Sequence, residues 1–360
     1  MELSTTNQKD LMSKIVSADH LRKFGEAVLL AHGVPQQDAH LLSDSLVAAE
    51  LWGHSSHGML RLPWYVERLR SGVMKAVTQS ETIIDNGALA VIDGHDGIGQ
   101  VLTAQATRMG IERARQHGVS AIGVRNSNHF GTAAYFTRMS AEAGCVVFLA
   151  TNASPAMAAW GGREKLIGTN PWSIAAPAGQ RGVAVMDIAN TAVARGKIYL
   201  AAERNETIPA TWAADEQGRP TTNASEAVHG LILPMAGHKG YVISFMMDVL
   251  AGVLTGSQFG SGVVGPYDPT KPSGCGHMLI TIDINAVMPR AEFENRMEAL
   301  IQEVKDSPTA EGIENIFFPG ELEDIHTHNH LITGIHVADK TWDSLSKLAT
   351  ETKTALPPCN

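Results

Sequence analysis

The spacing of apolar residues along the chain predicts helices and strands in alternation. From 17 to 51, apolar side chains recur at helical spacing and the pattern breaks at Gly33 and Pro35, so we expect a helical hairpin. Short apolar runs typical of strands lie at 88–93, 119–124, 145–150, 183–190 and 277–283. Helical patterns lie at 101–116, 132–143, 191–202, 242–254 and 290–305. This alternation is typical of an α/β fold, and the strongly apolar helix at 242–254 is expected to be buried.

Polar residues gather where one strand pattern gives way to a helix. The stretch 125–131 reads R-N-S-N-H-F-G and lies between the strand-like run 119–124 and a helix that begins near Thr132. This places His129 on a strand-to-helix loop, where α/β enzymes expose polar side chains to a substrate. Imidazole is well suited to exchange a proton near neutral pH. On this stretch alone, turn and helix-cap roles for these residues are an equally good interpretation.

A second polar group stands at 53–61, directly after the helical hairpin. Two histidines, two serines and one arginine occur there, among them Ser56, His57 and Arg61, and an amphipathic helix follows. Taken alone, the stretch is explained slightly better as a capped helix start with a surface arginine than as part of a site.

The glycine-rich turn at 94–100 argues against an ordinary dinucleotide-binding fingerprint. Its spacing is G-x-x-G-x-G, the reverse of G-x-G-x-x-G, and no acidic residue stands at a strand end about twenty residues further on. We therefore interpret it as a tight turn with helix capping.

Two further positions carry candidate chemistry. Asp187 ends the strand at 183–190, where it is either in a helix N-cap region or a site carboxylate. Lys239 follows His238 at the start of the apolar helix, where the helix dipole favours phosphate or carboxylate groups. The alternative for Lys239 is a lysine that extends from a core helix into solvent.

Composition excludes several classes of partner. A chain of 360 residues is long enough for two domains. Lys and Arg number 28 against 37 Asp and Glu, a formal net charge of −9 without a basic run, so nucleic acid and anionic membranes are not expected as partners. No apolar stretch is long enough for a membrane span or a signal peptide. Three widely spaced cysteines suit reduced thiols, and a cytoplasmic location is expected.

The histidine tract H-T-H-N-H at 326–330 raises the possibility of a metal hydrolase. Its histidines alternate as on a strand face, but the neighbouring residues lack a clear set of carboxylate and histidine ligands. We interpret these histidines as solvent-facing and expect no metal site.

Six motifs, taken together and in order, resemble one known family. They are S-H-G-x-x-R at 56–61, N-S-N-H-F-G at 126–131, G-T-N-P at 168–171, M-D-I-A at 186–189, H-K-G-Y at 238–241 and P-G-E at 319–321. Over roughly 17–350 the chain resembles the malate/L-lactate dehydrogenase-like NAD(P)-dependent oxidoreductases. That family also contains ureidoglycolate dehydrogenase, 2,3-diketo-L-gulonate reductase and delta-1-piperideine-2-carboxylate reductase, and it is unrelated to the Rossmann-fold lactate and malate dehydrogenases.

The resemblance implies an α/β (α+β) fold in two parts and a homodimer. A mixed or antiparallel sheet at 86–234 would bind the cofactor without a Rossmann crossover. A helical, dimerising part would be built from both chain ends, namely 1–85 with 235–310 and the C-terminal segment.

The resemblance also implies roles for individual residues. His129 would be the acid/base and Arg61 the anchor for the substrate carboxylate, with Ser56, His57 and Asp187 as further catalytic groups. NAD or NADP would lie beside Ser154, Asp187, Ile188, Ala189, His238, Lys239, Pro319, Gly320 and Glu321. The match at Ser154 is the loosest of these.

The chemistry of a 2-oxo acid reduction requires the same parts. It needs a hydride source, a proton donor such as protonated His129, and a cation such as Arg61 that grips the carboxylate through two parallel hydrogen bonds. The leading hypothesis is hydride transfer between NAD(P)H and C2 of a small 2-oxo or 2-hydroxy acid. The alternative is reduction of a cyclic imino acid such as piperideine- or pyrroline-2-carboxylate. A third hypothesis, a non-catalytic ligand-binding dimer, is disfavoured by the joint presence of His129, Arg61 and Asp187.

Overall fold

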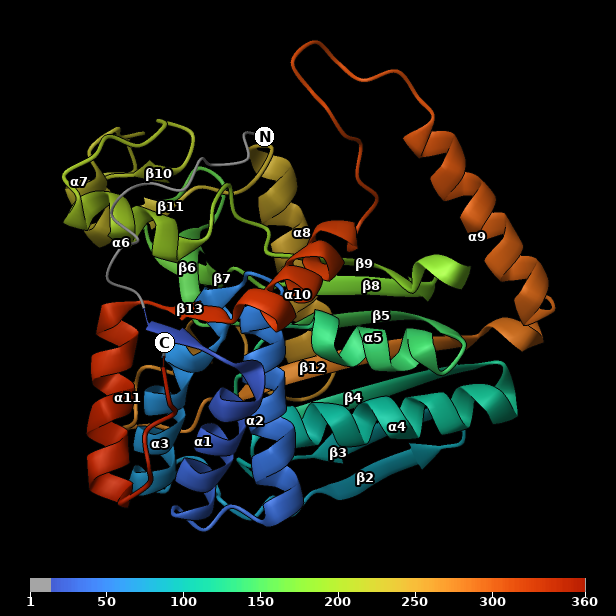
Figure 1. The fold of residues 1–360 in the computed structure, drawn as a ribbon, viewed down its shortest axis with the longest axis horizontal. Coiled ribbons are helices and arrows are strands. Elements are labelled where there is room, and N and C mark those ends of the chain that lie inside the picture. The colour runs from blue at the N-terminus through green and yellow to red at the C-terminus, as the bar shows by residue number, and fades with distance from the viewer. Residues whose placement is uncertain (1–13, 360) are drawn as a thin grey trace.

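A seven-stranded mixed sheet forms the centre of the computed structural model, which describes residues 14–359 (Figure 1). Its strand order is β2-β3-β4-β12-β5-β8-β9. The bounds are β2 Glu81–Asn86, β3 Leu89–Asp93, β4 Val119–Ser127, β12 Cys275–Asp283, β5 Cys145–Thr151, β8 Trp172–Pro177 and β9 Val183–Ile188. The strands expected at 88–93, 119–124, 145–150, 183–190 and 277–283 are therefore confirmed, with small shifts at their ends.

The central strand of this sheet comes from late in the chain. β12 pairs antiparallel with β4 on one side and with β5 on the other. The range 235–310 was expected in the helical part, but β12 from this range lies in the sheet. Its apolar residues favour this place, because the strand pairs with a neighbour on both sides and Leu279 is fully buried.

Strand directions gather the candidate site at one edge of the sheet. Because β12 runs against both β4 and β5, those two strands are parallel, and β9 runs parallel to β5 through antiparallel β8. The carboxyl ends of β4, β5 and β9 therefore meet at the same edge. These ends carry His129, residues 152–154 and Asp187.

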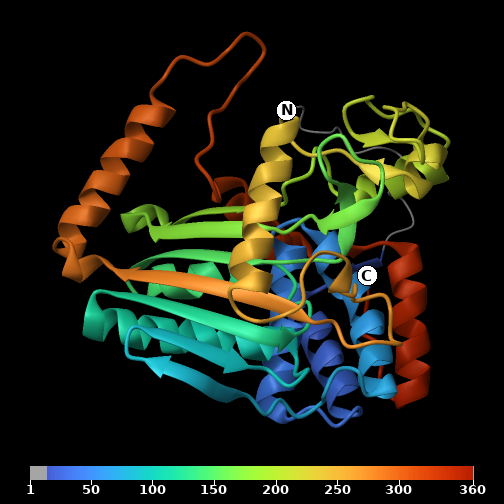
Figure 2. The ribbon, with the colours of Figure 1, turned by 180° about the vertical axis from the view of Figure 1, so that it is seen from behind.

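Helices cover the two faces of the sheet unequally. α4 (Gly99–His117) and α5 (Ala134–Glu142) pack on one face, where Leu102, Phe136 and Leu149 share a buried cluster. α8 (His238–Asp248) and a π-helical turn at Val249–Val253 lie on the other, and Figure 2 shows much of that face uncovered.

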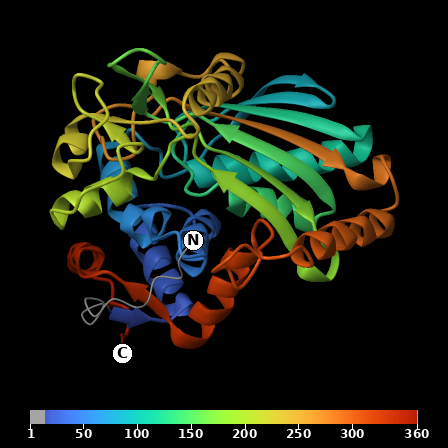
Figure 3. The same ribbon diagram turned by 90° about the horizontal axis from the view of Figure 1, so that it is seen from above.

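The helical part is built from both ends of the chain, as expected. It contains α1 (Ala18–Leu30), α2 (Gln36–Leu51), α3 (Leu62–Ser71), α10 (Glu321–Thr333) and α11 (Asp339–Thr352). β1 (Lys14–Val16) pairs antiparallel with β13 (Ile335–Val337), and both strands contribute to the same apolar cluster as α1, α2 and α3. Figure 3 shows the blue and red helices packed beside the sheet.

Two smaller units lie at the periphery. One contains β6 (Pro155–Ala158), β7 (Lys165–Gly168), α6 (Arg195–Glu203), β10 (Ala213–Ala214), α7 (Ala224–His229) and β11 (Leu231–Ile232). The other is an arm, in which α9 (Arg290–Lys305) and the segment 306–317 extend from the body before the chain returns to α10 (Figure 1).

Two sequence-based expectations differ from the structure. The helix expected to be buried at 242–254 exposes Phe245 by 47% and Leu254 by 62%, because one side of it packs on the sheet and the other side has no neighbouring element from the described residues. The histidine tract 326–330 lies on α10 and not on a strand; His326 and His330, one helical turn apart, stack with centroids 5.9 Å apart.

The described part of the chain contains no helix with the length and apolar character of a membrane span.

Candidate active site

A buried carboxylate shapes the S-H-G-x-x-R stretch. Glu50, at the end of α2, accepts a hydrogen bond from the Met59 backbone N–H at 2.8 Å. A Cβ on Gly58 would lie only 2.2 Å from the Glu50 carboxylate, so the chain can turn closely around it only with glycine at that position. Burial raises the pKa of Glu50. The short helices Ser55–His57 and Met59–Arg61 are thereby set at the start of α3.

This stretch brings three predicted site residues together. The Ser56 hydroxyl lies 2.9 Å from His57 Nδ1, and Arg61 Nε donates to the Ser56 carbonyl at 2.6 Å. The Arg61 guanidinium also lies 4.2 Å above the Trp64 ring. Its two terminal nitrogens have no hydrogen-bond partner within the described part of the chain, so the fork that can bind a carboxylate stays open.

His129 faces this group from the end of β4. Its ring stacks on the His57 ring with centroids 5.8 Å apart and an interplanar angle of 19°. The Tyr65 hydroxyl lies 2.7 Å from His129 Nδ1, and the Gly131 N–H donates to the same nitrogen at 3.2 Å. Both contacts therefore occupy Nδ1, which leaves Nε2 to face a ligand.

Burial and neighbouring cations make the positive form of His129 unfavourable. Desolvation, followed by Arg61, His57, His277 and Arg68, holds the pKa of His129 well below 6.5. The pKa of His57 is lowered to about 3, first by burial and then by Arg61. At neutral pH both rings are uncharged, and Arg61 and Arg68 are the cations that act on His129.

A buried arginine holds the chain next to His129. The Arg68 side chain is 1% exposed, and its Nη2 donates to Asn128 Oδ1 at 3.0 Å. Its other bonds go to the carbonyls of Asp268 and Lys271 in the loop before β12. The Asn128 amide in turn donates to carbonyls in the glycine-rich turn, including Gly97 at 2.9 Å.

A buried histidine joins the strand ends below the site. His277 of β12 bonds the Ser127 hydroxyl through Nε2 at 2.7 Å and the Thr151 hydroxyl through Nδ1 at 2.8 Å. The first is the end of β4 and the second the end of β5, so one side chain bridges both. Burial lowers the pKa of His277 to about 3, so the bridge is made by the neutral ring.

Asp187 caps a helix, but not the helix that follows its own strand. Its Oδ2 accepts a hydrogen bond at 2.8 Å from the N–H of Ala134, the first residue of α5. Burial raises its pKa, and the nearby His54 opposes that shift. The Asp187 carboxylate therefore bonds the backbone of α5, whereas Tyr65 is the side-chain partner of His129.

The candidate cofactor residues fall into three places. Ile188 and Ala189 continue β9 at the site edge, and Ser154 follows β5 at the same edge. The Pro319 carbonyl accepts from the Val185 N–H at 3.0 Å, which docks the turn containing Gly320 on β9. The Glu321 side chain is engaged elsewhere, because it pairs with Lys305 of α9 and accepts from the Phe318 N–H.

The start of α8 fits a phosphate-bearing group. His238 and Lys239 are exposed, no side chain caps the helix, and Gly237 precedes it with φ +64°. The Trp160 ring lies 5.8 Å from the His238 ring and lines a cavity of about 660 Å³. A cavity of this size can hold a large part of a cofactor.

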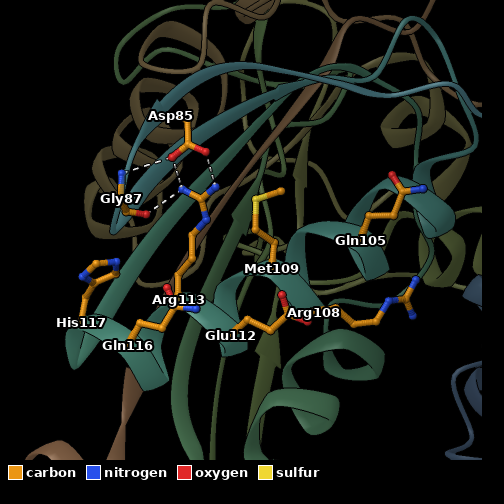
Figure 4. A pocket seen from close by; sticks show the side chains of 9 residues that line it. All are labelled: Asp85, Gly87, Gln105, Arg108, Met109, Glu112, Arg113, Gln116 and His117. Carbon is orange, nitrogen blue, oxygen red and sulfur yellow. Dashed lines mark hydrogen bonds and ion pairs between the residues drawn. The ribbon is translucent and has the colours of Figure 1, made fainter.

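Another cavity, of about 580 Å³, lies on the outer side of α4 (Figure 4). There Arg113 forms an ion pair with Asp85 at 2.7 Å, and no predicted site residue lines the cavity. No group of three or more metal-binding side chains occurs between residues 14 and 359.

Sequence reasoning missed several residues that shape the pocket. Tyr65 and Arg68 lie in the amphipathic helix after 53–61 and were not singled out, yet they stand four and seven residues after Arg61, which places all three on one face of a helix. Glu50 gave no signal, and Asn128 was recognised only as part of the N-S-N-H-F-G motif, because their roles depend on which backbone groups they meet in the fold.

The glycine-rich turn at 94–100 forms a tight turn, as expected, but no side chain caps α4. A Cβ on Gly99 would lie 2.2 Å from the Asn128 carbonyl oxygen and 2.6 Å from that of His129. Glycine therefore lets the first turn of α4 pack directly against the backbone of the candidate acid/base.

Comparison with known proteins agrees with this architecture. Residues 16–346 match the family model described as malate/L-lactate dehydrogenase. The chain is 36% identical to malate/(S)-sulfolactate dehydrogenase of Methanothermus fervidus, over 94% of this chain and 98% of the relative. It is 32% identical to ureidoglycolate dehydrogenase (NAD(+)) of Escherichia coli K12, over 94% and 98%.

A solved structure extends the match to three dimensions. Sulfolactate dehydrogenase from Methanocaldococcus jannaschii superposes with a TM-score of 0.90 at 33% identity, covering 95% of this chain and 98% of that chain. The motifs, the non-Rossmann sheet and these matches agree, and the chain belongs to the malate/L-lactate dehydrogenase family.

Proposed function

We propose that this protein is an NAD(P)-dependent dehydrogenase that interconverts a small 2-hydroxy acid and its 2-oxo acid. The observation that carries the proposal is a linked cluster around Arg61 and His129. Arg61 Nε donates to the Ser56 carbonyl, while its two terminal nitrogens have no partner among the described residues. The His57 ring, which contacts the Ser56 hydroxyl, stacks on the ring of neutral His129. The relatives named above act on 2-hydroxy acids, and one carries NAD(+) in its name. Reduction of a cyclic imino acid is the alternative, since it needs the same hydride donor and carboxylate anchor.

The residues of the pocket divide the chemical work. Arg61 binds the substrate carboxylate through two parallel hydrogen bonds and turns C2 toward the cofactor. In the oxidation, Nε2 of neutral His129 accepts the hydroxyl proton when the ring is in the tautomer with its own proton on Nδ1. In the reduction, the imidazolium returns that proton to the oxygen at C2. Ser56 holds His57 beside this ring, and Asp187 fixes the start of α5 next to the pocket.

NAD or NADP, when bound, supplies or accepts the hydride. The residues fit such a group: Lys239 and the uncapped start of α8 suit its phosphates, and Ser154, Ile188 and Ala189 line the adjoining strand ends. His238 and the turn at 319–321 are proposed to contact the cofactor as well, although the Glu321 carboxylate is turned toward Lys305.

A homodimer is part of the proposal. On the uncovered face of the sheet, Ile280, Phe148, Ile174 and Met186 form a row across β12, β5, β8 and β9. Ile174 is 39% exposed, and Phe245 of α8 is 47% exposed on that side of the sheet. Apolar surface on this scale favours a protein partner, and a second copy would bury it around a twofold axis.

A cytoplasmic location is also proposed. Cys145 and Cys275 are buried free thiols and Cys359 is an exposed one, a pattern that suits a reducing compartment.

Replacing His129 tests the activity directly. We expect wild-type protein to oxidise or reduce nicotinamide nucleotide with a member of a 2-hydroxy and 2-oxo acid panel, run with both NAD and NADP. His129→Gln lowers kcat by roughly 10²- to 10⁴-fold, because the proton acceptor is lost, while nucleotide binding measured by calorimetry survives. The control is His117→Gln, an exposed histidine at the end of α4. Near wild-type turnover in His129→Gln, or activity of the wild type with piperideine-2-carboxylate alone, would contradict the leading proposal.

Arg61→Lys tests whether the substrate carboxylate is bound by the paired hydrogen bonds of a guanidinium or only by a positive charge. We expect KM for the acid to rise roughly ten- to a hundred-fold with a smaller change in the KM for the nucleotide, because lysine cannot make the paired hydrogen bonds. Arg115→Lys, on the exposed side of α4, serves as the matched control. An unchanged KM for the acid in Arg61→Lys rules out this anchor.

The lowered pKa of His129 predicts the pH profiles. The free enzyme already holds the base form at neutral pH, so kcat/KM for oxidation is flat above pH 6.5, and its acid limb lies below that value. The reduction needs a proton taken up with the substrate, so its kcat/KM falls as pH rises through neutrality. Steady-state rates in both directions check this, and an oxidation limb at or above pH 6.5 is the opposing outcome.

Sedimentation tests the dimer. The wild type is expected to sediment as a dimer at micromolar concentration, and Phe245→Asp as a monomer, because a carboxylate cannot be buried unpaired in the interface. Val77→Asp, at a residue 53% exposed in the loop before β2, should stay dimeric. A monomeric wild type would exclude the homodimer.

A further inference from the structure

Gln100 is a fully buried amide without a partner. It is the second residue of α4, its exposed fraction is 0%, and neither Oε1 nor Nε2 has a hydrogen-bond partner among residues 14–359. An orphaned buried amide costs stability, whereas an apolar side chain of the same shape at such a position is neutral or stabilising. The position therefore calls for a functional explanation.

The Gln100 amide lies behind the His129 ring, on its Nδ1 side. The close approach of Gly99 to the Asn128 and His129 carbonyls brings the first turn of α4 against that loop. A Cβ on Gly131, whose N–H points at Nδ1, would lie 4.0 Å from Gln100 Nε2. Gln100 also lies near the Tyr65 phenol and opposes the rise that burial gives to the pKa of Tyr65, although no hydrogen bond within 3.5 Å joins the two side chains.

Proton exchange at Nε2 of His129 requires that Nδ1 carries a proton. To accept a proton at Nε2, neutral His129 must carry its own proton on Nδ1, and the imidazolium that results keeps it there. Nδ1 then has to donate to the Tyr65 oxygen 2.7 Å away, instead of accepting from Tyr65 and Gly131. The Tyr65 hydroxyl proton must therefore turn to another acceptor.

We propose that Gln100 is a positioning residue that accepts the Tyr65 hydroxyl through Oε1 and so holds His129 in the tautomer with its proton on Nδ1. When the ring is in the other tautomer, Tyr65 donates to Nδ1 and its oxygen can accept from the Gln100 NH₂. An amide has both a donor and an acceptor, so it serves both states without carrying charge. This inference rests on the proposed role of His129 as acid/base.

The other groups around His129 do not supply this contact. The charged or titratable side chains that face the ring are Arg61 and Tyr65 beside the pocket, His57 from the preceding short helix, Arg68 from α3 and His277 from β12. Arg61 and Arg68 repel the imidazolium, and so do His57 and His277 when they are protonated. Of this set Tyr65 alone bonds Nδ1, and the Gly131 backbone N–H donates to the same nitrogen at 3.2 Å. The N–H of Gly131 favours an unprotonated Nδ1, so a proton on Nδ1 requires that the Tyr65 hydroxyl proton has another acceptor.

Two substitutions of opposite chemistry test the inference. Gln100→Leu removes the acceptor, so the share of His129 with its proton on Nδ1 falls, and kcat falls about ten-fold with little change in KM for the acid. Gln100→Glu offers an ionised acceptor, so that share rises and the pKa of His129 rises with it. Gln100→Met replaces Gln100→Leu if the branched side chain does not fold. Gln116→Leu is the control on the same helix, in the outer cavity of Figure 4.

The readouts separate positioning from structure. Nitrogen-15 chemical shifts of His129, assigned by their loss in His129→Gln, report the tautomer in ligand-free protein, so they remain valid if no acid in the panel is a substrate. The thermal unfolding temperature of Gln100→Leu should change little, so that a fall in kcat is not a loss of folded protein. In a Tyr65→Phe background, Gln100→Leu should have no further effect on kcat or on the tautomer.

One result overturns the inference. If Gln100→Leu and Gln100→Glu both fold and leave the His129 tautomer and its titration as in the wild type, Gln100 does not act on the ring. A full additional loss of kcat from Gln100→Leu in the Tyr65→Phe background would likewise show that Gln100 does not act through Tyr65.

Discussion

The site depends on one strand pairing: β12 lies antiparallel between β4 and β5. This pairing makes β4 and β5 parallel, so that the chain leaves both strands at the same edge, where His129 and Asn152 follow. His277 of β12 joins the hydroxyls at the two strand ends and sets the spacing of that edge. A Rossmann crossover reaches a similar edge by placing helices between parallel strands; here a strand from much later in the chain has the same effect.

That edge lies next to an unusual concentration of positive charge. Arg61 and Arg68 are both largely desolvated, and the bonds that Arg68 makes go to carbonyl and amide oxygens, not to a carboxylate side chain. The pocket thus keeps a positive field that an anionic substrate can neutralise. Burial first, and the charge of Arg61 second, keep His129 uncharged. If Arg61 binds the substrate carboxylate as proposed, neutralising its charge favours proton uptake by His129, so substrate binding and proton uptake would be coupled.

Local patterns in the sequence predicted the helices and strands well, because periodicity and breakers such as Gly33 and Pro35 act over short distances. The sheet order was not predictable, since His277 meets Ser127 across 150 positions of the chain. The same limit explains Asp187, whose capped helix precedes its own strand. His326 and His330 were placed on a strand because histidines two apart fit a strand face, while those four apart fit a helix equally well. Tyr65 was hidden in an apolar pattern, although its hydroxyl completes the candidate site.

The pocket and the rest of the fold contribute to stability with opposite signs. The fully buried neutral His277, the half-buried neutral His57 and His129, the buried Arg68 and the unpaired Gln100 amide are each unfavourable in isolation. They persist because the elements that carry them are held from outside the pocket: α3 and the start of α4 by the apolar cluster of the helical part, and β4, β5 and β12 by paired strands under α4 and α5. Apolar replacements inside the pocket should therefore tend to raise stability while they remove chemistry, which is the opposite of their expected effect in those clusters. The sign of the change in stability on apolar replacement, more than burial itself, therefore distinguishes a residue that serves function from a residue that serves packing.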